Sequence, residues 1–375
     1  MSAPLAVTGW SAVSALGIGA GTFSDGIIAG RTAGQGAERD DTAPAPGLEG
    51  SVPGFDIRRL LGRKNTRAMD RITGLTVLTV GRLLDAEQAA GHEFSGHETG
   101  FVLGTTTGSV QSMMDFSRDS FIQDRPYLVD PARFPYAVMN CAAGHSAIWH
   151  GLRGPNATVA SGQVAGLSAL RYAARLRHSG HARSVLCGAV EELTPQRVWL
   201  EQQRGEEGGC RRPGEGCAVF RLESLDDVAT GNRPALGYLL ATAFRVFPDA
   251  AAVPQLLADC VRSVLKAAGA TPAEVWAIAA DLPDPQYAGL SEMAGGRPRR
   301  ISLAGRLGDT GAASAALLLA AILSHAAVDR ASGGRVALLA SADREGLLGA
   351  AAFRLPHHNG AKGPVSNGVR LQRGR

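Results

Sequence analysis

Short apolar runs alternate with longer amphipathic segments along most of the chain. Such runs predict buried strands, and apolar positions that recur every three or four residues predict helices. In the first part of the chain, the predicted strands are 5–8, 101–103, 184–187 and 217–222. The predicted helices in this part are 23–29, 67–90, 110–122 and 165–177.

The second part of the chain repeats this plan. Its predicted strands are 236–242, 275–280, 336–340 and 350–355, the last of them at a sheet edge, and its predicted helices are 253–268 and 310–327. Strands and helices that alternate in two similar parts predict an α/β fold with helices between sheets. The predicted divisions are an N-terminal half at 1–225, a C-terminal half at 226–356 and a polar, Gly- and Arg-rich flexible tail at 357–375.

The longest apolar run, 311–327, has the character of a membrane span but not its length. It is interrupted by Ser314, Ser324 and His325 and is slightly short for a bilayer. We therefore predict a buried core helix and expect no membrane partner. The N-terminus lacks the basic region of a secretory signal, which predicts a cytoplasmic protein.

Composition narrows the function classes. Of the 375 residues, 45% are hydrophobic and only 19% are charged, so the chain can bury a substantial core. The net charge of +4 is mild and no Lys/Arg block is suited to reading nucleic acid, so no nucleic-acid partner is expected. The cysteines are odd in number and lack CxxC spacing, which predicts reduced thiols rather than disulfides or a zinc site. They are Cys141, Cys187, Cys210, Cys217 and Cys260.

One segment carries specific chemistry. Residues 151–167 are GLRGPNATVASGQVAGL, which resembles GPxxTVxxxC, the turn of β-ketoacyl synthases that presents the nucleophilic cysteine. Gln163 occupies the place of that cysteine. Four more segments resemble motifs of the same family, in the family's order: VTGWSAVSALG at 7–17, RAMDR at 67–71, GAVEELTP at 188–195 and GEGCAV at 214–219. The resemblance implies the thiolase-like fold, a five-layer αβαβα sandwich of two similar halves that is normally dimeric.

The resemblance also implies where the catalytic groups would lie. β-Ketoacyl synthases use a cysteine nucleophile and two histidines, and this chain has Gln163 in the cysteine position. The first histidine position falls near Asp281, in the segment 280–284, and the second falls on Gly308 or Asp309. An amide is a poor nucleophile and cannot form an acyl thioester. We therefore expect no condensing activity, no catalytic residue, no cofactor and no metal.

With glutamine at this position, the chain resembles the chain-length-factor subunits of type II polyketide synthases, which are β subunits of the ketosynthase. The resemblance implies two partners: a catalytic ketosynthase subunit in a heterodimer, and an acyl carrier protein bearing a phosphopantetheine-linked chain. The subunit's side chains would set the length of the acyl tunnel sterically, in polyketide antibiotic biosynthesis. The segments 130–135 and 139–144 are more similar to polyene-type, highly reducing systems than to aromatic ones.

The helix after Gly108 contains the candidate length gate. Val110, Met113, Met114 and Ser117 have the i, i+3, i+4 and i+7 spacing of one helical face. The resemblance places this helix at the subunit interface, where a deformable methionine suits a tunnel end. Packing of the same face into the chain's own core is the alternative.

Several other chemistries have less support. Some ketosynthases with glutamine for cysteine decarboxylate malonyl-carrier protein, but they keep both histidines to stabilise the enolate; this activity is the alternative function. Cys141 lies at the start of a small-residue helix, and His145 and His150 are five apart, which does not suit a metal pair on one helical face. Asp281 and Asp284 predict a solvated turn.

Gln163 itself has two interpretations. Its amide bonds to backbone as an inert filler, or the side chain plugs the pocket or holds the interface with the partner's active site. The two are compatible, and we expect a structural and interface role rather than a catalytic one. The glycine-rich segments lack GxGxxG and a P-loop lysine, so nucleotide binding is not expected.

Overall fold

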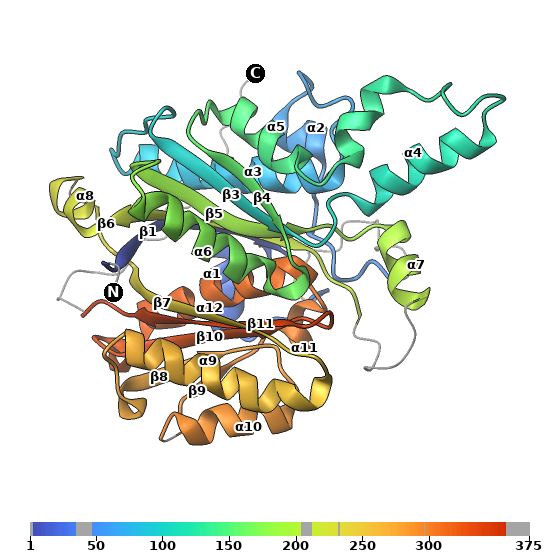
Figure 1. Cartoon of the computed structure of the whole chain (residues 1–375). Helices are drawn as coiled ribbons and strands as arrows, with labels where there is room; N and C mark the ends of the chain where they lie inside the picture. Colours follow the sequence, from blue (N-terminus) through green and yellow to red (C-terminus); the bar gives the residue numbers. More distant parts are fainter. Residues whose placement is uncertain (1–2, 35–46, 204–211, 232, 296, 358–375) are drawn as a thin grey trace.

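The computed structural model describes residues 3–34, 47–203, 212–231, 233–295 and 297–357 (Figure 1). Within these residues, strands form one hydrogen-bonded path in the order β4-β3-β5-β6-β1-β7-β11-β10-β8-β9, with β2 paired to β1. The strands are β1 (Leu5–Ser14), β2 (Gly17–Ile18), β3 (Thr99–Thr105), β4 (Asn156–Ala160), β5 (Ser184–Glu191), β6 (Gly216–Ser224), β7 (Gly237–Val246), β8 (Val275–Ala279), β9 (Arg299–Ile301), β10 (Val336–Ala342) and β11 (Leu347–Arg354).

Helices connect most of these strands. The α-helices are α1 (Ala20–Ile28), α2 (Ile57–Leu61), α3 (Arg71–Ala89), α4 (Val110–Ile122), α5 (Cys141–His150), α6 (Ala165–His178), α7 (Pro195–Gln203), α8 (Leu225–Gly231), α9 (Val253–Ala267), α10 (Asp284–Met293), α11 (Ala304–Leu307) and α12 (Ser314–Val328). The 3-10 helices are η1 (Pro131–Ala137), η2 (Gly162–Val164), η3 (Ala250–Ala252), η4 (Pro272–Glu274), η5 (Gly311–Ala313) and η6 (Arg330–Ser332).

The strand path consists of two halves with the same plan. In the first half, β3 runs parallel to β4 and β5, and β6 and β1 follow antiparallel. In the second half, β8 runs parallel to β9 and β10, and β11 and β7 follow antiparallel. The halves meet where β1 pairs with β7, at Leu5 opposite Leu239. The predicted edge position of 350–355 is wrong, because β11 lies between β7 and β10.

Three apolar clusters fix the layers. In β5, Leu186 and Val190 face α3 and α5 on the outer side, while Val185, Cys187 and Ala189 face the central helices. This alternation explains an unbroken apolar run, since the strand is buried on both faces. Helices α1, α6 and α12 form the middle layer, and α9 and α10 cover the outer face of the second sheet (Figure 1). The layers therefore follow the order helix, sheet, helix, sheet, helix, and this order confirms the predicted thiolase-like α/β fold.

The apolar run near residue 311 is a core helix, as predicted. Gly311–Val328 is the only helix of the described residues that is long and apolar enough to cross a membrane, by length and composition alone. Of this segment, 78% is buried inside the protein. Its length and composition are therefore explained by its place between the two sheets.

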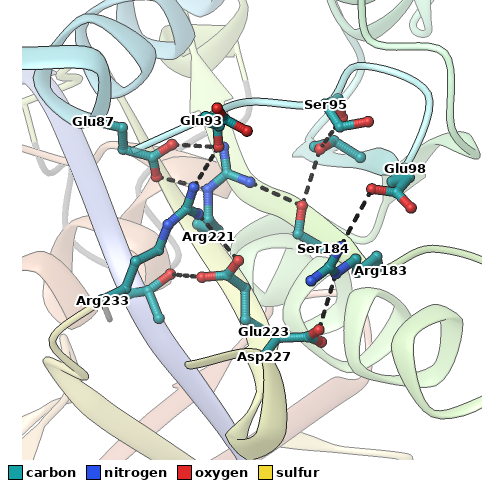
Figure 2. A network of polar contacts seen from close by, with 12 residues as sticks. Glu87, Glu93, Ser95, Glu98, Arg183, Ser184, Arg221, Glu223, Asp227 and Arg233 are labelled. Carbon is teal, nitrogen blue, oxygen red and sulfur yellow. Dashed lines mark hydrogen bonds and ion pairs between the residues drawn. The ribbon is translucent and has the colours of Figure 1, made fainter. Parts of the chain in front are cut away.

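A buried ionic network joins α3 to the first sheet (Figure 2). Arg221, on β6, is only 2% exposed, and its guanidinium donates to both carboxylate oxygens of Glu87 at 2.6 Å and to Ser184 Oγ at 2.8 Å. A buried charge is tolerated when it is paired and hydrogen-bonded in this way. Gly9 leaves room for the pair, because a Cβ there would lie 2.8 Å from Glu87 Oε1.

Several short elements were not predicted. Strands β4 and β9 and helices α7, α8 and α10 lack the length or periodicity that identifies longer elements, whereas the helix start predicted at Cys141 is confirmed by α5. The division into 1–225 and 226–356 stays a prediction. The predicted tail lies outside the described residues from position 358 onward.

Candidate functional site

A cavity of about 290 Å³ opens at the carboxyl ends of the parallel strands of the first half. Its walls come from the segments after β3 and β4, the end of β5, helices α4 and α7, and the loops at 309–311 and 343–347 of the second half. Carboxyl ends of parallel strands are where α/β folds place ligand sites. Three residues singled out from the sequence line this cavity together: Val110, Gln163 and Asp309.

Gln163 lies on η2, directly after β4, and is bonded to the second half of the chain. Its amide Nε2 donates to the two carboxylate oxygens of Asp309 at 3.3 and 3.4 Å. Its backbone N donates to Asp343 Oδ1 at 3.0 Å, and its carbonyl accepts from Ser341 Oγ at 3.0 Å. The expectation that the amide bonds to backbone is wrong, because a carboxylate side chain lies within reach.

Of the two residues predicted for the second histidine position, Gly308 and Asp309, only Asp309 is among the described residues that line the cavity. Gly308 has a φ of +80°, and a Cβ there would lie 2.5 Å from the carbonyl oxygen of Arg212, so no larger residue fits without a backbone shift. The Asp309 carboxylate also accepts from Gly311 N at 2.9 Å and lies 3.6 Å from the Arg344 guanidinium.

Asp281 does not line the cavity. Its Oδ1 accepts from the backbone N of Leu303 and Ala304 at 2.7 and 3.0 Å, and its Oδ2 accepts from Ser314 Oγ at 2.8 Å. The predicted solvated turn is therefore wrong for Asp281, which ties the start of α11 to α12. Asp284 is exposed and pairs with Arg300 at 2.7 Å.

Two buried acids beside the cavity were missed by the sequence analysis. Glu191 lines it and accepts hydrogen bonds from Thr106 Oγ1 and from Ala312 N, the latter at 3.2 Å; burial raises the pKa of Glu191. Burial, with the nearby charge of Asp70, raises the pKa of Glu192 to about 8. Both acids belong to the segment 188–195, whose family resemblance was the available signal.

Glu192 anchors the N-terminus of α4. It accepts from Gln111 N at 3.2 Å and from Ser109 Oγ at 3.1 Å. Ser109 is also the N-cap of the helix, since its Oγ accepts from Ser112 N at 3.1 Å. Ser112 Oγ donates in turn to Asp70 Oδ2 at 3.1 Å. Helix α4 thus has a firmly held origin, from which it reaches out of the body of the protein (Figure 1).

The candidate gate residues on α4 differ in exposure. Val110 is buried and lines the cavity, whereas Met113 is 41% exposed, Met114 is half-buried and Ser117 is exposed. Packing of this whole face into the chain's own core is therefore wrong. Beyond the first turn, the face is available to a partner.

The Cys141 region has the features of a packed helix. Burial raises the pKa of the Cys141 thiol to about 11, which suppresses the reactive thiolate. His150 Nε2 lies 2.9 Å from the carbonyl of Val77, and the centre of the His145 ring lies 6.0 Å from that of Tyr136 and 6.3 Å from that of Trp149. Among the described residues, no group of three His, Cys, Asp or Glu side chains is placed to hold a metal. The described cysteines are free thiols, and Cys210 lies outside the described residues.

The cavity's described lining residues include neither cysteine nor histidine. They present an amide, carboxylates, hydroxyls and the cations of Arg197 and Arg344. Arg197 is buried and donates to the backbone carbonyls of Glu192 and Asp309 at 2.7 and 3.2 Å, so it supports the walls. The arrangement can hold a polar group, and none of the described lining residues supplies a thiol that could form an acyl thioester.

Residues 2–227 match the model of the β-ketoacyl synthase N-terminal domain. The chain is 29% identical over 192 residues to 3-oxoacyl-[acyl-carrier-protein] synthase 2 of Synechocystis, which covers 50% of this chain and 46% of that protein. The matched part thus spans about half of that relative. A chain of the ishigamide ketosynthase/chain length factor is 36% identical and superposes with a TM-score of 0.83 over 94% of this chain and 99% of its own.

A second solved structure shares the fold at lower identity. It is a type II polyketide synthase acyl-carrier protein in complex with its ketosynthase bound to the hexaketide. The matched chain is 19% identical, with a TM-score of 0.77 over 95% of this chain and 100% of its own.

Proposed function

The chain belongs to the β-ketoacyl synthase family, and from that membership we propose that it is a non-catalytic chain-length-factor subunit of a type II polyketide synthase. In this role it pairs with an active ketosynthase in the cytoplasm and shapes the acyl tunnel that sets product length. The observation that carries the proposal is the hydrogen bond between Gln163 and Asp309, the residues to which the motif resemblance assigns the positions of a nucleophile and a histidine.

The pair is incompatible with the family's chemistry at this site. Condensation needs a thiolate to take the acyl chain, and Gln163 supplies an amide. Decarboxylation of malonyl-carrier protein needs donors aimed at the developing enolate. The Asp309 carboxylate beside Gln163 would instead repel that charge, so the geometry does not favour the decarboxylase alternative.

The edge strand β4 supports pairing with a second subunit. No described strand pairs with its outer side. Its sequence, NATVA at 156–160, contains no charge and no proline, and such an unprotected edge is a template for strand pairing with another chain. The opposite edge, β9, carries exposed Arg299 and Arg300, which protect it.

The arm formed by α4 and the segment up to residue 139 supports the same partner. It carries most of the large exposed apolar side chains of the first half. These are Met113, Phe121, Ile122, Tyr127, Leu128, Phe134, Val138 and Met139. Large exposed apolar surfaces mark protein interfaces, and permanent complexes bury about 2,000 Å² or more. We propose that the ketosynthase covers this arm and that its acyl tunnel ends against Met113, Met114 and Ser117.

A basic surface beside α2 supports the acyl carrier protein as the second partner. Arg58, Arg63, Lys64 and Arg67 are exposed and have no ion-pair partner among the described residues. Arg58 and Arg67 also line a cavity of about 410 Å³. A phosphopantetheine-linked carrier brings a phosphate, which guanidinium groups bind well.

Co-expression with the cognate ketosynthase tests the proposed function. We expect one stable heterodimer on gel filtration, and polyketide formation only when both subunits and the carrier protein are present. A chain that purifies as a well-behaved monomer and forms no complex with the ketosynthase would contradict the proposal. The polyene subclass predicts reduced, unsaturated products from the complete system.

A further inference from the structure

Two carboxylates and two serine hydroxyls form a continuous row at the N-terminus of α4. Glu192, directly after β5 and 0% exposed, has its Oε1 and Oε2 at 3.1 and 3.3 Å from Ser109 Oγ. Ser112 Oγ lies 3.1 Å from Ser109 Oγ and 3.1 Å from Asp70 Oδ2. Asp70 is the N-cap of α3, where its Oδ1 accepts from Thr73 N at 3.0 Å. The row of Glu192, Ser109, Ser112 and Asp70 thus joins β5, the first turn of α4 and the start of α3.

This row contains too few hydrogens when both acids are ionised. Each serine hydroxyl donates one hydrogen. Ser112 donates to Asp70, and Ser109 donates to an ionised Glu192. The contact between the two hydroxyls then contains no hydrogen, although they lie 3.1 Å apart. A proton on Glu192 removes this defect, because the acid then donates to Ser109 and the hydrogen of Ser109 turns to Ser112. Every contact of the row then contains one hydrogen.

The surroundings of Glu192 favour the same protonation. A buried carboxylate is costly when no cation faces it. The neighbouring cations are used elsewhere: Arg71 pairs with Glu215 at 2.5 Å, and Arg197 donates to backbone carbonyls, among them that of Glu192 at 2.7 Å. Burial, with the charge of Asp70, accordingly raises the pKa of Glu192 to about 8. Burial raises the pKa of Asp70 too, but Asp70 is partly exposed and caps a helix N-terminus, which favours its negative charge.

We propose that Glu192 and Asp70 share one proton through Ser109 and Ser112, and that Glu192 is the positioning residue whose protonation fixes the direction of α4 and of the arm that α4 begins. Helix α4 packs against η1, which belongs to the same arm, and against α7. Beyond these contacts it extends away from the body of the protein (Figure 1). The anchorage of its first turn therefore decides where the arm lies.

Loss of the shared proton weakens this anchorage. The proton leaves Glu192 for solvent, so the pair carries two negative charges in place of one. The hydrogen of Ser109 turns back to Glu192, and the contact between Ser109 and Ser112 loses its hydrogen. Like charges in a buried site repel each other strongly, because little water screens them. The first turn of α4 should therefore loosen as pH rises through about 8.

Other titratable groups around the row do not produce this change. They are Arg71 on α3, Glu191 on β5, Arg197 on α7, Glu215 before β6, Tyr136 on η1, and Cys141 and His145 on α5. Burial raises the pKa of Cys141 to about 11, raises that of Tyr136 above its usual value and lowers that of His145, so these three stay neutral between about pH 7 and 9. Glu191 is a second buried acid, and the experiment must separate it from Glu192.

The test compares two variants that each replace one buried acid by its amide. In Glu192→Gln the amide accepts with Oε1 and donates with Nε2, so it reproduces the protonated acid at every pH. In the control Glu191→Gln the acid removed accepts from Thr106 and Ala312, and not from α4. Amide hydrogen exchange of Val110–Ile122 is measured in the full chain at about pH 7 and 9 and corrected for the intrinsic exchange rate. Exchange of α9, in the second half of the chain, reports on global stability.

We expect the wild type to lose protection in α4, by about five- to tenfold from pH 7 to 9, since an acid of pKa about 8 is about nine-tenths ionised at pH 9. Protection in α9 should not change. Glu192→Gln should keep the protection of α4 at both pH values, and Glu191→Gln should lose it as the wild type does. Ser112→Ala, which cuts the row before Asp70, should lower the protection of α4 already at pH 7. The inference is overturned by a wild-type α4 whose protection is the same at both pH values, by a Glu192→Gln variant that loses protection as the wild type does, or by an equal loss in α9.

One consequence rests on the proposed function. If the arm contacts the ketosynthase, the heterodimer of the wild type should weaken from pH 7 to 9 more than the heterodimer of Glu192→Gln. The comparison of the two chains cancels any effect of pH on the ketosynthase itself. A heterodimer that never forms overturns the proposed function, and the hydrogen exchange of the chain alone still decides the inference about Glu192.

Discussion

Met113 provides a direct probe of the proposed length gate. Its side chain is 41% exposed in the isolated chain, so Met113→Ala should change the free energy of unfolding by less than about 1 kcal/mol. In the complex, the same side chain is proposed to meet the tip of the growing acyl chain. Overpacking a filled site costs about 1–3 kcal/mol. Relief of that overlap should favour a further extension step by about 5- to 140-fold, at about 1.4 kcal/mol per factor of ten in rate.

The assay is the product distribution of the reconstituted complex with malonyl-carrier protein, read by mass spectrometry. Met113→Ala should shift products toward greater length, and Ser117→Trp should shift them toward shorter length, with early extension rates unchanged. Asp115→Ala is the control, since Asp115 is only one or two residues from Met113, Met114 and Ser117 in sequence and therefore lies on a different face of the same helix. If Met113→Ala and Ser117→Trp alter only solubility or complex yield, the reasoning is refuted and the gate lies elsewhere on the interface, for instance at 126–134.

Three further predictions concern the scaffold around the site. Glu87→Gln deprives the buried Arg221 guanidinium of its counter-charge and should lower the free energy of unfolding in urea by about 3–5 kcal/mol; a loss below about 1 kcal/mol would contradict the role of the pair. Folding raises the pKa of Glu192 from 4.5 to about 8, so between these pH values the folded chain keeps a proton that the unfolded chain releases. The free energy of unfolding should therefore fall as pH rises through this range, and Glu192→Gln should reduce this dependence on pH. Gly162 has a φ of +52°, and in Gly162→Ala the added Cβ would clash with the Asp343 carboxylate, so this variant should lower the Tm. The double variant Gly162→Ala/Asp343→Ala should recover part of the lost Tm, and a double variant that recovers none would show that the strain is not at this contact.

The fold was predictable because most of its elements are long and strongly patterned. The 110–122 helix is confirmed residue for residue, since Ser109 caps its start and the apolar periodicity ends with Ile122. The strand β11 was placed at an edge because its alanine-rich sequence does not show whether both faces are buried. Only its pairing with β7 and β10, which are distant from one another in sequence, shows that β11 is an inner strand.

The site was predictable at its positions but not in its contacts. Motif spacing led to Gln163 and to the choice between Gly308 and Asp309, and backbone geometry at Gly308 then favours Asp309. The hydrogen bond between Gln163 and Asp309 spans 146 positions of sequence, so no local pattern predicts it. The role of Asp281 was hidden for a similar reason, since its partners Leu303 and Ser314 are 22 and 33 positions away in sequence.

The central claim is that this chain shapes the acyl tunnel and has no catalytic activity of its own. The most direct test measures carbon dioxide release from malonyl-carrier protein. It should be followed for the isolated chain, and for its complex with a ketosynthase whose nucleophilic cysteine and histidines have been replaced by alanine. The account predicts release no greater than background in both samples, and polyketide formation from the complex with the intact ketosynthase. Release above background from the isolated chain, abolished by Gln163→Ala, would contradict it.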